Sequence, residues 1–203
     1  MWQSIVKAVS HAEGEDHQLV SEPQSVSGGC INAAWVIELN CPTGGRQRCF
    51  VKLNDIAFAD QFAAEAEGLK ALRQPGVIRV PRFICSGIAS GQAFLVLEHI
   101  EMRNPMSRRS EELLGGQLAD LHKTFASDRL FGWTHDNAIG ATPQVNTPST
   151  DWAQFFTELR LRFQFELAER KGFSFRQSDD LLNRRVPEIL NGHRPEPSLL
   201  HGD

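Results

Sequence analysis

The alternation of hydrophobic and polar positions divides the chain into two halves with different periods. Between residues 18 and 100, short apolar runs of β-strand character alternate with Gly-rich turns, which is typical of an antiparallel sheet. The clearest strands are expected at residues 30–39, 48–53 and 93–100. One helix is expected at residues 60–72, where apolar side chains recur at helical spacing. The first half is therefore predicted to be a sheet with one helix.

The second half has helical periodicity. After a polar stretch at residues 101–110, which we interpret as a linker, two apolar faces follow one another. The first face consists of Leu114, Leu118, Leu121 and Phe125, and the second of Trp152, Phe155, Phe156, Leu159 and Phe163. We expect the aromatic face to be core packing rather than a ligand cage. The loop at residues 131–150 is long enough to suggest a function.

These periods predict an α+β protein with two lobes. Residues 1–101 would form an N-terminal lobe of antiparallel sheet plus helix, and residues 102–203 a helical lobe.

Composition narrows the class of protein. The chain is 41% hydrophobic and 23% charged, which suits a globular core. The net charge of −4 comes from scattered charges, so neither a nucleic-acid surface nor an anionic-lipid surface is expected. No apolar run is long enough for a membrane span, and residues 1–4 lack the features of a signal peptide. The four cysteines have neither zinc-site spacing nor disulfide density, so we expect reduced thiols and a cytoplasmic protein.

Candidate nucleotide-binding residues occur at two places in the sheet. Gly28, Gly29 and Cys30 lie at a turn where glycines would let backbone N–H groups approach phosphate oxygens. A hairpin turn that needs positive φ explains the two glycines equally well. Lys52 alternates out of an apolar strand, as a phosphate-pairing lysine would, although an ordinary edge-strand lysine gives the same pattern.

The helix at residues 60–72 favours the phosphate interpretation. Glu65 falls on its apolar face, between Leu69 and Leu72, whereas Glu67 points to the opposite side. A carboxylate on a buried face needs a partner, and Lys52 is the nearest candidate in the pattern. The alternative is that Glu65 lies at the edge of the apolar stripe and reaches water.

The strand at residues 93–100 ends in polar positions just before the linker. In a two-lobed phosphotransferase this point is the hinge, where the backbone groups of Glu98, His99, Ile100 and Glu101 would pair with an adenine edge. Any core strand has a similar composition, so the hinge interpretation rests on the place of this strand just before the linker.

The chain closes on His201, Gly202 and Asp203. An aspartate in a tight turn can accept the proton of a substrate hydroxyl during phosphoryl transfer, so His201 and Asp203 are the candidate catalytic residues. A match of three residues is weak alone and gains weight from its order after the Gly-rich turn, Lys52, Glu65 and the hinge.

In this order of elements the chain resembles the aminoglycoside phosphotransferase and protein-kinase-like group, and more closely the fructosamine kinase (ketosamine-3-kinase) family. The resemblance is carried by several stretches: Val-Ser-Gly-Gly-Cys-Ile-Asn at 26–32, Phe-Val-Lys-Leu-Asn at 50–54, Phe-Leu-Val-Leu-Glu at 94–98, Asp-Asn-Ala-Ile-Gly at 136–140, Trp-Ala-Gln-Phe-Phe-Thr-Glu-Leu-Arg-Leu at 152–161 and Pro-Ser-Leu-Leu-His-Gly-Asp at 197–203.

The resemblance implies a two-lobed protein-kinase-like fold and an enzyme that uses ATP and Mg to phosphorylate the 3-hydroxyl of ketosamines. The phosphorylated adduct is unstable and leaves, which frees the amine of a protein or of a small glycated compound. Two alternatives stay open, an aminoglycoside or other small-molecule kinase and a nucleotide-binding pseudokinase without catalysis.

The resemblance also sets expectations for individual residues. It places the Mg ligands beyond Asp203, so we expect no metal ligand in this chain, an incomplete helical lobe and no kinase turnover by the 203 residues alone. Asp136 and Asn137 would face the sugar or hold their loop in shape, with the second role favoured. Cys30 is expected to be the most oxidation-sensitive thiol, so that a disulfide-linked dimer is an alternative to a monomer.

Overall fold

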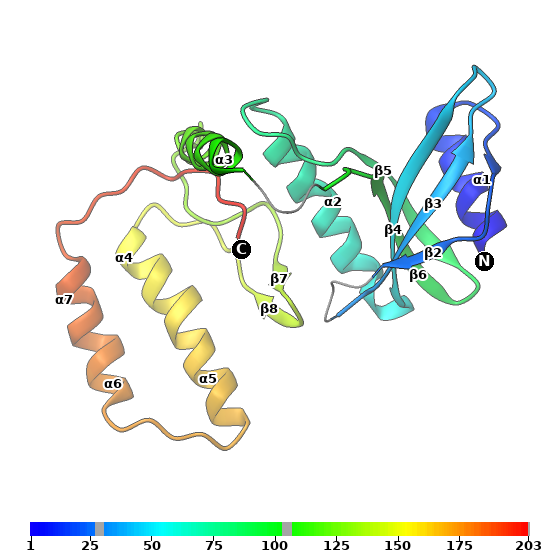
Figure 1. Cartoon of the computed structure of the whole chain (residues 1–203). Coiled ribbons are helices and arrows are strands. Elements are labelled where there is room, and N and C mark those ends of the chain that lie inside the picture. Colours follow the sequence, from blue (N-terminus) through cyan, green and yellow to red (C-terminus); the bar gives the residue numbers. More distant parts are fainter. Residues whose placement is uncertain (27–30, 103–106, 203) are drawn as a thin grey trace. The chain divides into compact units, whose positions relative to one another are not determined.

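The computed structural model describes residues 1–26, 31–102 and 107–202 (Figure 1). The predicted site residues Gly28, Gly29, Cys30 and Asp203 lie outside the described residues. The chain forms two compact units, Met1–Leu121 and His122–Asp203. The division between the units follows helix α3 (Arg108–Leu121), and the lobe boundary predicted between residues 101 and 102 stays a prediction.

Unit 1 contains the predicted antiparallel sheet. Its strands are β1 (Gln18–Leu19), β2 (Gln24–Val26), β3 (Ala33–Asn40), β4 (Arg46–Asp55), β5 (Phe83–Ala89) and β6 (Gln92–Glu98). They run in the order β1-β3-β4-β6-β5, and β2 also pairs with β3. The strand expected at 30–39 begins at Ala33, and the strand expected at 93–100 ends at Glu98.

The two faces of the sheet are covered by different helices (Figure 1). Successive residues of a strand point to opposite faces, so Cys49, Val51 and Leu53 of β4 pack toward α1 (Trp2–Glu13). Phe50, on the other face, packs in a second cluster with residues of α2 (Ala59–Arg73). The helix predicted at residues 60–72 is therefore confirmed, and it shares a sheet face with Lys52.

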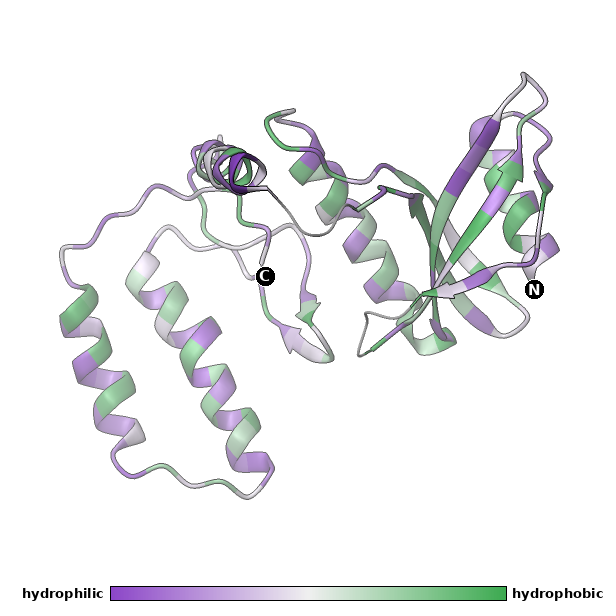
Figure 2. Cartoon of the chain, viewed as in Figure 1, coloured by the Kyte–Doolittle hydropathy of each residue, from purple (hydrophilic) through white to green (hydrophobic). Residues whose placement is uncertain are grey.

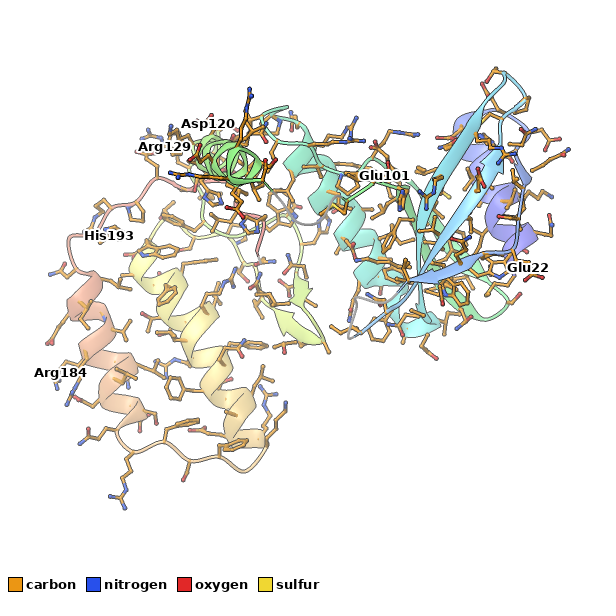
Figure 3. All side chains as sticks on the ribbon, viewed as in Figure 1. Glu22, Glu101, Asp120, Arg129, Arg184 and His193 are labelled. Carbon is orange, nitrogen blue, oxygen red and sulfur yellow. The ribbon has the colours of Figure 1, made fainter. Side chains whose placement is uncertain are left out.

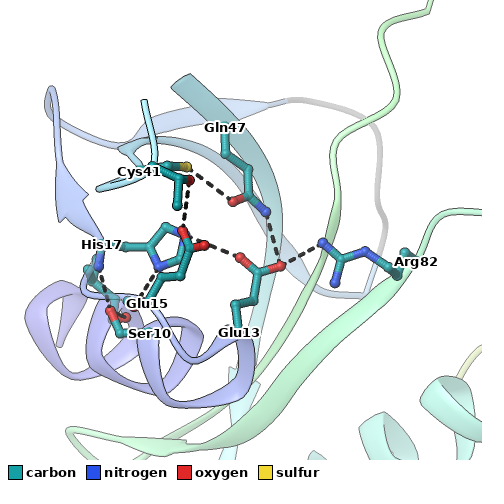
Figure 4. A network of polar contacts seen from close by, with 9 residues as sticks. Ser10, Glu13, Glu15, His17, Cys41, Gln47 and Arg82 are labelled. Carbon is teal, nitrogen blue, oxygen red and sulfur yellow. Dashed lines mark hydrogen bonds and ion pairs between the residues drawn. The ribbon is translucent and has the colours of Figure 1, made fainter. Parts of the chain in front are cut away.

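Helix α1 is an element that the sequence reasoning missed. Its buried face consists of Ile5, Val6 and Val9, and the helix stops at Gly14, which has a left-handed φ of 72°. A polar network then ties the helix end to the sheet (Figure 4). Glu13 accepts hydrogen bonds from Arg82 at 2.6 Å and from Gln47 at 3.3 Å, and its other oxygen lies 3.2 Å from the buried ring of His17.

The linker and first helix of the second half differ from the prediction. Helix α3 begins at Arg108, inside the stretch interpreted as linker, and ends at Leu121, the one buried residue of the helix. Phe125 lies beyond the helix, is 56% exposed and forms an isolated bridge with Ser198. The helical period was therefore extended one turn too far, because a single apolar residue after the helix matched its spacing.

Unit 2 is built from short helical segments and one hairpin. The hairpin consists of β7 (Asn137–Ile139) and β8 (Thr142–Gln144), inside the loop expected at residues 131–150. The next segments run from α4 (Trp152–Gln154) through the π-helix η2 (Phe155–Arg162) to α5 (Phe163–Arg170). A further run consists of α6 (Ser178–Asp180), the π-helix η3 (Leu181–Arg185) and α7 (Val186–Leu190). Figure 2 shows hydrophobic and hydrophilic residues mixed along both runs.

The aromatic stripe does contribute to packing, as predicted. Phe155 is 5% exposed, and Phe131 of the preceding loop packs against Trp152 and Phe155 with ring centroids 5.1 and 6.1 Å apart. In a π-helix, hydrogen bonds join residues five apart, so the side-chain period differs from the 3.6 residues assumed for the stripe. Of the helices in the described ranges, none combines the length and apolar character needed to cross a bilayer.

Candidate nucleotide and acceptor sites

The predicted pair between Lys52 and Glu65 forms in unit 1. The Nζ atom of Lys52 lies 2.6 Å from Oε1 of Glu65, and the two side chains are 26% and 31% exposed. The short 3-10 helix η1 (Ile56–Phe58) connects β4 directly to α2, and Asp55 caps it by accepting from the N–H of Ala57. This short connection fixes the first turns of α2 next to Lys52, which is why Glu65 reaches the lysine.

Strands β2 and β3 precede and follow residues 27–30 in the sequence. Strands β2 and β3 pair antiparallel, and Ala34 of β3 is the direct cross-strand neighbour of Lys52. The side chain of Asn54, two residues after Lys52, donates to the carbonyl of Ile31 at 3.1 Å and to Oδ1 of Asn32 at 2.7 Å. Asn54 thus anchors the exit of the turn to the strand that carries the lysine. The sequence reasoning missed this role, although Asn54 shares the alternation of Lys52.

The hinge residue Glu98 is an anchor for its surroundings. Its carboxylate accepts from the side chain of Arg79 at 2.8 Å and from the N–H of Arg82 at 3.1 Å, and lies 3.7 Å from the guanidinium of Arg73. The hydrogen bond from Arg79 is the main reason that the pKa of Glu98 lies below its ordinary value. The N–H of Glu98 donates to the carbonyl of Arg82 at 2.8 Å. The predicted nucleotide contact of Glu98 stays a prediction.

The residues after Glu98 leave the sheet. The N–H of His99 donates to the carbonyl of Arg48 at 3.3 Å, and burial, followed by the charge of Arg48, lowers the pKa of the His99 ring. Ile100 is half-buried, and Glu101, labelled in Figure 3, is exposed. No backbone carbonyl of the described residues accepts from the N–H of Ile100 or Glu101. These two N–H groups are the hinge donors that a base edge could use.

A hollow of about 300 Å³ opens on the Lys52 face of the sheet. It is lined by Ser21, Gln24, Val36, Glu38 and Arg48. Val36 and Glu38 pair with Phe50 and Arg48, and Arg48, Phe50 and Lys52 alternate on one face of β4. The hollow was not predicted, but this period of two in residues 48–52 could have indicated that Arg48 accompanies Lys52.

In unit 2, Asp136 and Asn137 both hold their own loop. Oδ1 of Asp136 accepts from the N–H of Asn146 at 2.7 Å, and Oδ1 of Asn137 accepts from the side chain of Gln144 at 3.1 Å. These contacts bear out the favoured structural role. Substrate contact by either residue stays a prediction.

The segment that leads to the His-Gly-Asp sequence is held by backbone hydrogen bonds. Leu199 donates to the carbonyl of Thr124 at 2.9 Å, and Ala126 donates to that of Pro197 at 2.9 Å. The ring of His201 stacks on that of His122 with centroids 5.6 Å apart, and Gly202 has a left-handed φ of 83°. The buried Nε2 of His122 has no hydrogen-bond partner within the described part of the chain.

An antiparallel sheet that presents a lysine to a helical glutamate, followed by a hinge strand and a helical unit, is the arrangement of the protein-kinase-like fold. The comparisons with known proteins agree with this class. The family model described as fructosamine kinase matches residues 1–203. The chain belongs to the fructosamine kinase family.

Individual relatives support the family. A probable ketoamine kinase of Synechocystis is 41% identical over 202 residues, which are 100% of this chain and 65% of the relative. The chloroplastic protein-ribulosamine 3-kinase of rice is 38% identical over 183 residues, 88% of this chain and 51% of the relative. A crystal structure from Haemophilus somnus assigned as a fructosamine-3-kinase has a TM-score of 0.83 at 29% identity, and covers 98% of this chain and 64% of that one. The chain thus spans less than two thirds of the length of these relatives.

The contacts of Glu98 predict an acid-sensitive contribution to stability. Because its pKa is lowered in the folded protein, the ionised carboxylate stabilises the fold at neutral pH, and this contribution is lost as the pH falls below about 4.5. The group is partly exposed and screened, so we expect Glu98→Gln to lower the free energy of unfolding by about 1 kcal/mol at pH 7. Urea unfolding at a series of pH values measures it, and a difference that does not shrink as the pH falls below about 4.5 would contradict the assignment.

Gly132 predicts a steric limit in unit 2. Its φ is 113°, and a Cβ atom there would lie 2.6 Å from the carbonyl oxygen of Asn146. We expect Gly132→Ala to destabilise unit 2 by about 1–3 kcal/mol. Gly172→Ala is the matched control, because Gly172 has a φ of 87° but open space around it. Thermal unfolding should show the larger loss for Gly132→Ala, and equal losses would mean that backbone strain alone sets the cost.

Proposed function

We propose that the protein is an ATP-dependent kinase that phosphorylates the 3-hydroxyl of fructosamines and related ketosamines, and thereby frees glycated amines. The observation that carries this proposal is the contact between Lys52 and Glu65, with 2.6 Å between Nζ and Oε1, on the sheet face that also carries the hollow. Membership of the fructosamine kinase family supports the choice of substrate class.

In this proposal the residues of unit 1 bind ATP. Lys52 holds phosphate oxygens with its ammonium group, and Glu65 keeps that group oriented. The N–H groups of Ile100 and Glu101 face the adenine edge, and the backbone of residues 28–30 approaches the phosphates. The predicted contacts of Gly28, Gly29 and Cys30 remain part of this proposal.

Asp203 is proposed as the general base. It takes the proton of the 3-hydroxyl as the new O–P bond forms and the bond between the β- and γ-phosphates breaks, which leaves ADP. His201 is proposed to position the turn through its stacking on His122. Gly202, with its left-handed φ, provides the tight turn that the base requires.

The requirement for Mg is also a proposal. Among the described residues, no three His, Cys, Asp or Glu side chains lie close enough together to hold a metal ion. The described part of the chain thus supplies no such site, and we derive no step through the metal.

We further propose a cytoplasmic location, which the free thiols of Cys41, Cys49 and Cys85 support. The disulfide-linked dimer through Cys30 stays a prediction, as does the absence of turnover by the 203-residue chain.

The direct test is phosphate transfer by the protein expressed from its complete gene. With ATP and fructosyl-lysine, ³¹P NMR should show phosphate on the 3-hydroxyl of the sugar. Kanamycin serves as the competing acceptor. Phosphorylation of kanamycin alone would assign a small-molecule kinase, and nucleotide binding without transfer to either acceptor would assign a non-catalytic protein.

The Lys52–Glu65 pair predicts a graded loss of activity. We expect Lys52→Met to lower kcat/KM by about 100-fold or more, and Glu65→Gln by about tenfold, because the lysine loses its phosphate contact or its orientation. Glu67→Gln, on the exposed side of the same helix, should change kcat/KM by less than about twofold. Steady-state kinetics with fructosyl-lysine measures all three, and equal effects at Glu65 and Glu67 would refute the assignment.

A further inference from the structure

Arg160 lies in the π-helix η2 and reaches back to the long loop that precedes the helix. Its guanidinium donates to the carbonyl of Val145 through Nη1 and to Oδ1 of Asn146 through Nη2, the second at 2.7 Å. The same group lies over the ring of Phe155, 4.5 Å from the centroid, and donates to the carbonyl of Leu159 at 3.2 Å. A planar guanidinium is suited to this geometry, because it can donate in two directions while one face stacks on a ring.

Asn146 extends the contact of Arg160 across the loop. It is 2% exposed, and its side-chain nitrogen donates to the carbonyl of His135 at 3.0 Å. Its backbone N–H donates to Asp136 at 2.7 Å, and its carbonyl accepts from the N–H of Trp133 at 3.1 Å. Every polar group of Asn146 is therefore used. Its side chain joins His135 to Arg160, and its backbone binds Trp133 and Asp136.

The hairpin beyond these contacts carries three polar side chains, of which Asp136 is exposed and Asn137 and Gln144 are half-buried. Asp136 has one carboxylate oxygen in the bond to Asn146. The bond between Asn137 and Gln144 uses the oxygen of Asn137 and the nitrogen of Gln144. The amide nitrogen of Asn137, the amide oxygen of Gln144 and the second oxygen of Asp136 remain as one donor and two acceptors. Sugar hydroxyls both donate and accept, so a polyol suits this set.

The support from Arg160 is more than the hairpin itself requires. A tight hairpin is held by its own cross-strand bonds, whereas a half-buried cation such as Arg160 is partly desolvated, a cost that its hydrogen bonds must offset. A long loop held from behind by a rigid element is a common way to place binding residues accurately.

We propose that Arg160 is a positioning residue, which together with Asn146 holds the loop of residues 133–146 in the conformation that binds the sugar of the ketosamine acceptor. This inference rests on the proposed function and adds the acceptor-binding loop and its support to it. Arg160 acts through Asn146 and Asp136, and does not itself contact the acceptor.

The test compares Arg160→Gln with a matched control in the same helix. Arg162→Gln removes an equivalent guanidinium that binds Glu158 at 2.6 Å and Asn183 at 2.7 Å, away from the loop. In the protein expressed from its complete gene, Arg160→Gln should raise the KM for fructosyl-lysine by about tenfold, with the KM for ATP changed by less than about twofold. Arg162→Gln should leave both constants within about twofold of the wild type.

A second variant keeps the test decisive if Arg160→Gln does not fold. Arg160→Lys keeps the charge but cannot donate to both Val145 and Asn146 in the same planar geometry, so we expect an intermediate KM for the acceptor. If circular dichroism shows that Arg160→Gln is unfolded, the KM of Arg160→Lys for the acceptor is the deciding measurement. A folded variant with a lower melting temperature and an unchanged acceptor KM would show a purely structural role and overturn the proposal.

A failure of the proposed kinase function can be distinguished from a failure of the positioning role. If the wild type does not phosphorylate fructosyl-lysine, calorimetric titration with the same compound shows whether the wild type and Arg160→Gln bind it. Binding by the wild type that Arg160→Gln weakens about tenfold would support the positioning role without the kinase activity. No binding by the wild type would overturn the positioning role together with the proposed function.

Discussion

A lysine on a half-buried sheet face needs a counter-charge, and much of unit 1 is arranged around this requirement at Lys52. Strand β4 has one face against α1 and one face toward α2, so Lys52 must leave the sheet on the side of α2. The three-residue connection η1 then places α2 where Glu65 meets the ammonium group. The pair contributes little to the free energy of unfolding, because both groups are about one-third exposed. Its structural effect is to fix the position of the Lys52 ammonium group on this face of the sheet.

Arg82 links the end of helix α1 to the end of strand β6. Its side chain binds Glu13 at the end of α1, while its backbone N–H and carbonyl bind the carboxylate and the N–H of Glu98. Arg82, directly before β5, therefore connects the N-terminal helix to the end of β6. Because Glu13 also accepts from Gln47 of β4, a displacement of α1 would also be transmitted to β4.

The parts of the fold that could be predicted from the sequence are those with strong and regular periods. The apolar runs of β3, β4 and β6 and the helical spacing of α2 were sufficient to place Lys52 and Glu65 on facing elements. Strand β5 was not predicted, because its register shifts between Phe83 and Cys85 and its central positions are small or polar. Helix α1 was missed because its apolar face has only three buried residues.

The side-chain contacts of unit 2 were harder to predict because they depend on π-helical geometry. A pattern based on 3.6 residues per turn describes the face of Trp152 and Phe155, but it does not indicate that Arg160 turns back toward Val145 and Asn146. The signal that was available is chemical: an arginine follows an aromatic pair in a helix that comes directly after a long loop. An arginine so placed needs several acceptors, and backbone carbonyls of the preceding loop are the nearest ones. The same reasoning explains why Asn146 is buried, since its amide is the one group that can accept from the guanidinium and donate to His135 together.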